Sequence, residues 1–267
     1  MKTYIEKNSK WLGNYDNAKE LFRLNNLDFI IDFKNEKRLI HIADVGCGNG
    51  RSIKLIRSIF SNCSILAIDK IKDNCDYVNS TCSSELLEII HCDAVDFFAN
   101  DNSTLFDIVL FSWSFFDMLF EEDIDKRTIR FEAFLNDVKK HLNDSGYILI
   151  MQPTKGGSFE KLLTLFMPSS DEVYYFTHSF LKTHGFCGPE SIVPDKNDRL
   201  SIWSSFRYAN ENDLFDGISS IVYLETGRKL SKKEFNKIIM QFRTENGIGL
   251  NESIPLTDCV NIYYWKK

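Results

Sequence analysis

A glycine-rich segment near the start of the chain, residues 42–50 with the sequence IADVGCGNG, constrains the fold more than any other part of the sequence. It follows a short apolar run that indicates a buried strand, and it precedes residues 51–60, whose isoleucines recur at helical spacing. The glycines are therefore expected at a strand-to-helix turn, where a doubly wound sheet binds an adenosine-containing ligand. Glycine suits such a turn because a ligand lying against the sharply bent backbone leaves no room for a Cβ atom.

The spacing of these glycines separates two kinds of nucleotide site. A dinucleotide-binding turn reads G-x-G-x-x-G or G-x-G-x-x-A, with a small third residue that lets the helix pack closely. Counted from Gly46, that third position holds Arg51, and the turn reads G-x-G-x-G instead. With Asp44 before the first glycine, the segment resembles the first motif of the class I S-adenosylmethionine-dependent methyltransferases. An NAD-dependent oxidoreductase is the alternative from another enzyme class, and Arg51 argues against it.

Four later segments follow in the order and spacing of that superfamily. Residues 64–69, 87–93 and 106–112 each read as a buried strand with a polar end, and residues 142–151 look like a helix end, a glycine turn at Gly146 and the fifth strand. The segments 200–208 and 258–265 alternate apolar and polar residues and read as the last two strands. The resemblance implies an α/β fold with a doubly wound seven-stranded sheet, six strands parallel and one antiparallel. It also implies an N-terminal helical lid and helical insertions after the fifth and sixth strands.

The resemblance further implies S-adenosylmethionine as the cofactor and identifies the residues that hold it. In the superfamily, a carboxylate at the end of the second strand accepts hydrogen bonds from the ribose, and here that position is Asp69. An acidic residue after the third strand accepts from the adenine amino group, and the next backbone amide reaches the ring; these positions are Asp93 and Ala94. The expected cofactor contacts are Asp44, Gly46, Cys47, Gly48, Asp69, Lys70, Asp93, Ala94, Phe111 and Ser112.

The rest of the chain is expected to enclose the acceptor. Residues 1–38 form a polar, helical prelude that either folds over the site as a lid or packs onto the body. Residues 39–267 form the methyltransferase domain, with a helical substrate cap at residues 154–198 and 209–250. Aromatic residues between 159 and 180 could roof a pocket or simply fill the core. The expected substrate contacts are Trp11, Tyr15, Phe115, Phe116, Gln152 and Tyr175.

The catalytic group is the part of the function that the sequence leaves open. A hydroxyl acceptor of high pKa needs a general base or a metal, whereas an amine acceptor needs only to be neutral. Residues 112–117 carry no histidine and lack the Asn/Asp-Pro-Pro-aromatic motif of nucleic-acid amino methyltransferases. His41 and His91 fall in expected strands and read as core residues. His178, in the variable region, and Asp117, near a strand end, are the weak catalytic candidates.

Composition fits a soluble enzyme, and the scattered cysteines favour a reducing cytoplasm. The net charge is −6 and the short Lys/Arg pairs have acidic neighbours, so neither a nucleic-acid partner nor a basic groove is indicated. No apolar run approaches the ~18 residues of a membrane span, and the N-terminus lacks a signal-peptide apolar region. Seven cysteines occur without a C-x-x-C pair, so neither a metal site nor a disulfide framework is expected.

These features together predict methyl transfer from S-adenosylmethionine to a nitrogen or oxygen atom of a small-molecule acceptor. A protein or peptide methyltransferase and a non-catalytic cofactor-binding module remain as alternatives. An enclosed, mainly apolar pocket beside the sulfonium would favour the small molecule, because enclosure excludes water and fixes the acceptor in line. The acceptor, its attacking atom and the oligomeric state leave no trace in the sequence.

Overall fold

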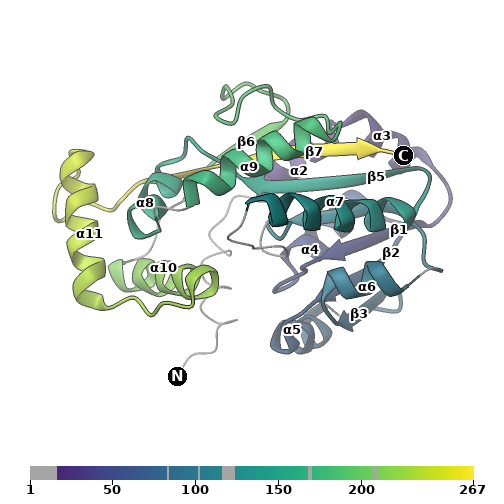
Figure 1. Cartoon of the computed structure of the whole chain (residues 1–267), viewed down its shortest axis with the longest axis horizontal. Helices are drawn as coiled ribbons and strands as arrows, with labels where there is room; N and C mark the ends of the chain where they lie inside the picture. Colours follow the sequence, from purple (N-terminus) through teal and green to yellow (C-terminus); the bar gives the residue numbers. More distant parts are fainter. Residues whose placement is uncertain (1–16, 83, 102, 116–123, 168–169, 207–209) are drawn as a thin grey trace.

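Seven strands form one sheet with helices on both faces in the computed structural model, which describes residues 17–82, 84–101, 103–115, 124–167, 170–206 and 210–267 (Figure 1). The strands are β1 (Ile40–Val45), β2 (Cys63–Asp69), β3 (Leu87–His91), β4 (Phe106–Ser112), β5 (Leu142–Pro153), β6 (Ser201–Phe206) and β7 (Leu256–Lys266). Their order in the sheet is β3-β2-β1-β4-β5-β7-β6. Only the pairings of β7 with β5 and β6 are antiparallel. The expected sheet of six parallel strands and one antiparallel strand is confirmed.

The strand order creates a point of reversal beside β1. β1 lies between β2 and β4. The chain therefore adds β2 and β3 on one side of β1, and then returns to add β4 and the later strands on the other side. Ligands of open α/β sheets bind at such a point, outside the carboxyl ends of the strands. Five of the six residues of β1 are buried, as expected of a parallel strand with helices on both faces. The reversal thus places the carboxyl end of β1, and the glycine turn after it, at the expected ligand edge.

Helices from the first part of the chain cover one face of the sheet. They are α2 (Asn17–Asn25), α3 (Asp28–Asn35), α4 (Arg51–Ile59) and α5 (Lys72–Cys82). Phe29 of α3 stacks on Tyr147 of β5, with ring centroids 4.2 Å apart, and Leu24 of α2 joins the same apolar cluster. The described part of the prelude is therefore packed onto the body. Trp11 and Tyr15 lie outside the described residues, so the lid over residues 1–38 stays a prediction.

The other face of the sheet packs against an aromatic layer. Its helices are α6 (Ala94–Asn100), α7 (Ile124–Lys140) and α9 (Ser170–Thr183). Phe131, Phe134 and Val138 of α7 are buried at the spacing of one helix face, which is the amphipathic pattern in their sequence. The Phe131 ring meets that of Phe180 from α9 edge-on, with centroids 5.3 Å apart. The second helix of the aromatic segment thus contributes to the main core.

Three further helices form a separate apolar cluster. They are α8 (Ser158–Phe166), α10 (Glu211–Thr226) and α11 (Lys232–Glu245), and they pack around the fully buried Phe235. In Figure 1 this group lies beyond the edge where β5 ends and β7 begins. The segment 154–198 is therefore divided, because α8 joins this group while α9 packs on the sheet. No helix of the described ranges is both long and apolar enough to span a bilayer.

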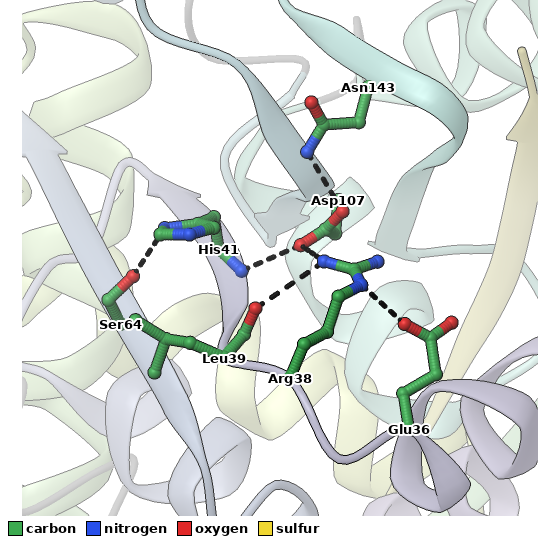
Figure 2. A network of polar contacts seen from close by, with 7 residues as sticks. All are labelled: Glu36, Arg38, Leu39, His41, Ser64, Asp107 and Asn143. Carbon is green, nitrogen blue, oxygen red and sulfur yellow. Dashed lines mark hydrogen bonds and ion pairs between the residues drawn. The ribbon is translucent and has the colours of Figure 1, made fainter.

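The amino edge of the sheet is joined by a polar network around Asp107 (Figure 2). The Asp107 carboxylate accepts hydrogen bonds from the Arg38 guanidinium at 2.7 Å, the His41 backbone amide at 2.8 Å and the Asn143 amide at 2.9 Å. Burial acts to raise the pKa of this carboxyl, but the hydrogen bonds from Arg38, His41 and Asn143 outweigh it and lower the pKa. The network links the starts of β1, β4 and β5, far from the glycine turn.

Candidate cofactor and acceptor site

The glycine turn is fastened to the end of β2. The Gly46 amide donates to the Ile68 carbonyl at 2.7 Å, and the Gly48 amide donates to Asp69 Oδ2 at 2.8 Å. Gly48 has φ +54°, and a Cβ placed on it would meet no atom within 4 Å. At Gly50, by contrast, a Cβ would lie 3.1 Å from the Cys82 sulfur. Gly50 therefore serves close packing against α5, whereas Gly48 borders open space.

Asp69 organises the start of the β2–α5 connection. It is buried, and its carboxylate accepts from the amides of Gly48 and Ile71 at 2.8 Å and from Asn74 Nδ2 at 3.2 Å to both oxygens. A carboxylate offers about four acceptor positions, so these contacts nearly fill it. A ribose diol at Asp69 would take the place of the longer Asn74 contacts. The carboxylate expected at the ribose thus also holds the glycine turn in shape.

Asp44 is a buried acid immediately before the turn. Its Oδ2 accepts from the Ser52 hydroxyl at 2.6 Å, and its Oδ1 has no hydrogen-bond partner within the described ranges. Burial raises the pKa of Asp44 to about 7, although the Ser52 hydrogen bond opposes the shift. An unsatisfied acceptor at this depth fits a site completed by a bound molecule.

The expected adenine side of the site lies at the end of β3. Asp93 caps the N-terminus of α6, where its side chain accepts from the Val95 amide at 2.8 Å. Ala94 is buried directly after it, and Lys70, at the end of β2, is exposed. The amide of Cys92 donates to the Asp69 carbonyl at 3.1 Å, which keeps the ends of β2 and β3 together. The Asp93 carboxylate can accept further hydrogen bonds in addition to the one from the Val95 amide.

The end of β4 carries a strained residue that the sequence does not reveal. Trp113 has φ +63°, and its amide donates to the Met151 carbonyl at 2.8 Å. Left-handed backbone outside glycine is uncommon and gathers at functional sites. The Arg51 guanidinium lies 5.2 Å from the Trp113 ring centroid and donates to the Ser112 hydroxyl at 3.1 Å. Ser112, an expected cofactor contact, is thus held by the residue that follows the glycine turn.

Arg51 also joins the prelude to the turn. Its guanidinium forms a 2.5 Å ion pair with Glu20 of α2, whose side chain is fully buried. Arg51 therefore bridges α2, the start of α4 and the end of β4. In the sequence, Arg51 stands out only as a residue too large for a dinucleotide motif, and Glu20 does not stand out at all. Their ion pair could not be predicted because it depends on how α2 packs against α4.

The aromatic residues expected at the acceptor lie in different surroundings. Phe115 is fully buried and meets the Phe111 ring edge-on, with centroids 5.1 Å apart, inside the aromatic layer. Tyr175 on α9 is 54% exposed, with the Lys155 ammonium 4.8 Å from its ring centroid. Phe116 and Asp117 lie outside the described residues. The aromatic rings are therefore not gathered in one place, and their substrate roles stay predictions.

A polar group lies where β5 ends beside β7. His178 Nδ1 of α9 lies 2.8 Å from the Tyr263 hydroxyl, and Asn261 Nδ2 donates to that hydroxyl at 3.2 Å. Gln152 is the direct partner of Asn261 across the two strands. His178 and Gln152, which were named from the sequence, are therefore grouped with Asn261 and Tyr263, which were not. A polar Asn261 inside an apolar, alternating strand was the available signal.

The two histidines expected in the core lie elsewhere. His41 and His91 are both exposed. His41 lies near the amino end of β1, and His91 is the last residue of β3. His41 Nδ1 lies 2.8 Å from the Ser64 hydroxyl, and His91 Nε2 lies 3.2 Å from the Lys70 carbonyl. The expectation of core positions was wrong because the helices do not cover these strand ends.

Comparison with protein families identifies the central part of the chain. Residues 43–150 match the family model of a methyltransferase domain. This segment begins in β1 and ends within β5, so it contains the glycine turn and the ends of β2, β3 and β4. No curated protein matches the sequence.

Solved structures with a similar fold are remote in sequence. The YcgJ protein of Bacillus subtilis is 13% identical, with a TM-score of 0.55 over 90% of this chain and 96% of its own. A Bacillus halodurans protein is 11% identical, with a TM-score of 0.55 over 91% of this chain and 98% of its own. The plantazolicin methyltransferase BpumL, solved with a desmethylPZN analog and SAH, is 14% identical, with a TM-score of 0.50 over 96% and 89%. At these identities the likeness shows the fold.

Proposed function

We propose that this chain, in which residues 43–150 match the family model of a methyltransferase domain, transfers a methyl group from S-adenosylmethionine to a nitrogen or oxygen atom of a small-molecule acceptor. The arrangement at the carboxyl edge supports this acceptor class. The group of α8, α10 and α11 lies beyond that edge, as a cap over a small molecule would (Figure 1). A net charge of −6 disfavours a nucleic-acid acceptor.

The proposed cofactor contacts follow from the geometry of the glycine turn. The open space beside Gly48 would receive the cofactor, and Asp69 would accept from its ribose in place of Asn74. Asp93 would accept from the adenine amino group while it caps α6. When bound, S-adenosylmethionine supplies an electrophilic methyl group on a sulfonium. The chain's own part is to bind, to orient and to keep water out.

We assign His178 a positioning role in place of that of a general base. Burial, together with the nearby Lys182, lowers the pKa of His178, so the ring is neutral near pH 7. Burial raises the pKa of Tyr263 to about 12, so the phenol keeps its proton and can donate it to His178 Nδ1. That nitrogen is then occupied and cannot accept a proton from the acceptor. Alignment of a neutral nucleophile can by itself supply much of the rate.

Cysteine chemistry supports a cytoplasmic location as part of this proposal. All seven cysteines are free thiols, and five of them are buried. A reducing compartment keeps such thiols unpaired.

The direct test is a calorimetric titration with S-adenosylhomocysteine, followed by a screen of small-molecule acceptors that detects S-adenosylhomocysteine release. We expect binding of the product and turnover with a member of the screen. Turnover confined to proteins or peptides would overturn the acceptor class. Binding of NAD without a response to S-adenosylhomocysteine would overturn the cofactor contacts as well.

A further inference from the structure

Two side-chain oxygens at the end of β5 lack donors. Gln152 Oε1 and Asn261 Oδ1 are both buried and have no hydrogen-bond partner within the described ranges. The two residues stand directly opposite in the antiparallel β5–β7 ladder, so their side chains share one face with Cβ atoms about 4.5–5.5 Å apart. Buried carbonyl oxygens are nearly always satisfied in folded proteins. Two such oxygens side by side indicate that a donor belongs between them.

The Asn261 amide takes part in a chain of hydrogen bonds with Tyr263 and His178. Its Nδ2 donates to the Tyr263 hydroxyl, which in turn lies 2.8 Å from His178 Nδ1. A phenol has one proton, so accepting from Asn261 leaves that proton for the neutral His178 ring. In this arrangement the amide nitrogen of Asn261 faces Tyr263. Asn261 Oδ1 is thereby presented as an acceptor on the side away from Tyr263.

The pair of oxygens stands at the edge where the superfamily binds its ligands. Val45 at the end of β1 is in register with Phe111 of β4, Phe111 with Ile150, and Ile150 with Tyr263. Gln152 lies two residues after Ile150 and Asn261 two residues before Tyr263, just past the carboxyl edge of the parallel strands. Gln152 as a residue is half-buried, although its Oε1 atom is buried.

We propose that Gln152 and Asn261 bind a neutral NH₂ group of the acceptor, as found in a primary amide or an aromatic amine. One N–H would donate to each of the two oxygens. A hydroxyl group has a single proton and could donate to only one of them. An ammonium group is disfavoured because Gln152, Asn261 and Tyr263 carry no negative charge to offset its desolvation. The inference deepens the proposed function and rests on it, because it names the chemical class of the acceptor.

The test uses two probes that differ only in the proposed group. Benzamide and acetophenone have the same size and carbonyl, but NH₂ in the first is CH₃ in the second. Their affinities are measured by NMR titration of the S-adenosylhomocysteine-saturated protein. We expect benzamide to bind at least about tenfold more tightly than acetophenone, since a polar site rejects an analogue without the donor.

Variants locate the preference at the two oxygens. Gln152→Met and Asn261→Leu keep the approximate side-chain shape and remove the acceptor, and each is expected to bring the affinity ratio close to one. Gln241→Met, on the exposed side of α11, is the control and should keep the wild-type ratio. Circular dichroism and the affinity for S-adenosylhomocysteine establish that each variant is folded.

Several results would overturn the proposal. They are an absence of benzamide binding, equal affinity of the two probes for the wild type, or a preference that survives in Gln152→Met and Asn261→Leu. A crystal structure in which a water molecule still bridges both oxygens beside bound benzamide would also contradict it. Loss of S-adenosylhomocysteine binding in the wild type would instead contradict the proposed function, so the two failures are distinguishable.

Discussion

At the scale of single residues, the proposed site depends on a glycine at a left-handed backbone position. Gly48 combines a left-handed φ of +54° with open space around its missing Cβ. We predict that Gly48→Ala weakens S-adenosylhomocysteine binding strongly, because the added methyl group occupies the space of the ligand. The left-handed backbone also costs an alanine about 1–2 kcal/mol of folding free energy. Calorimetry and urea unfolding measure the two effects separately.

Gly227 supplies the matched control for this prediction. It ends α10 with φ +66°, and a Cβ on it would likewise meet no atom within 4 Å. Gly227→Ala should lose similar stability and keep full affinity. If both variants bind alike, the turn at Gly48 does not border the cofactor.

The Asp69 carboxylate is the charged acceptor on which the ribose contact depends. Asp69→Ala removes it, and hydrogen bonds to charged groups contribute about 1.5–3 kcal/mol each. The affinity for S-adenosylhomocysteine should therefore fall at least about tenfold, by the conversion of about 1.4 kcal/mol per decade. Asp73→Ala makes the same charge change at an exposed position of α5 and should leave the affinity unchanged. An unaltered affinity in Asp69→Ala would show that the ribose lies elsewhere.

At the scale of elements, one buried ion pair joins the prelude to the cofactor turn. Glu20 of α2 and Arg51 of α4 have side chains that are 0% and 11% exposed. We predict that Glu20→Ala destabilises the fold by about 3–5 kcal/mol, because it leaves a buried guanidinium without its carboxylate. The measurement is urea unfolding followed by tryptophan fluorescence.

The exposed pair of Arg228 and Glu234, with side chains 42% and 38% exposed, provides the comparison. Glu234→Ala should cost less than about 1 kcal/mol, as solvent-exposed pairs do. Equal losses in the two variants would mean that α2 is not held by its ion pair.

At the scale of the whole molecule, two buried acids contribute to the response of stability to pH. Burial raises the pKa of Asp44 and of Asp258 to about 7, and both carboxyls ionise near 3.8 in the unfolded chain. Between these values the folded state binds more protons, so the free energy of unfolding contributed by these groups falls as pH rises from about 4 to 7. The loss is at most about 4 kcal/mol for each group.

This linkage predicts that Asp44→Asn and Asp258→Asn, combined, flatten the pH dependence of urea unfolding across that window. Asp73→Asn, at an exposed position, should leave the profile as in the wild type. An identical slope in the double variant and the wild type would show that both acids are ionised in the fold.

The sequence by itself determined the glycine turn, the strands and the helix faces. These features depend on local causes, namely φ values that only glycine adopts readily and the periodicity of apolar residues. The spacing around Gly46 and Arg51 was enough to separate a methyltransferase turn from a dinucleotide turn. Asp69 and Asp93 were located from the ends of single strands, which a linear pattern can mark.

Only the tertiary structure decided which distant residues meet. The antiparallel register of β7 brings Asn261 opposite Gln152, and a shift by one residue would turn Asn261 to the other face. The docking of α2 brings Glu20 to Arg51, and packing against β5 holds Trp113 in its strained conformation. None of these is written in a local pattern, because register and docking follow from the packing of the whole core.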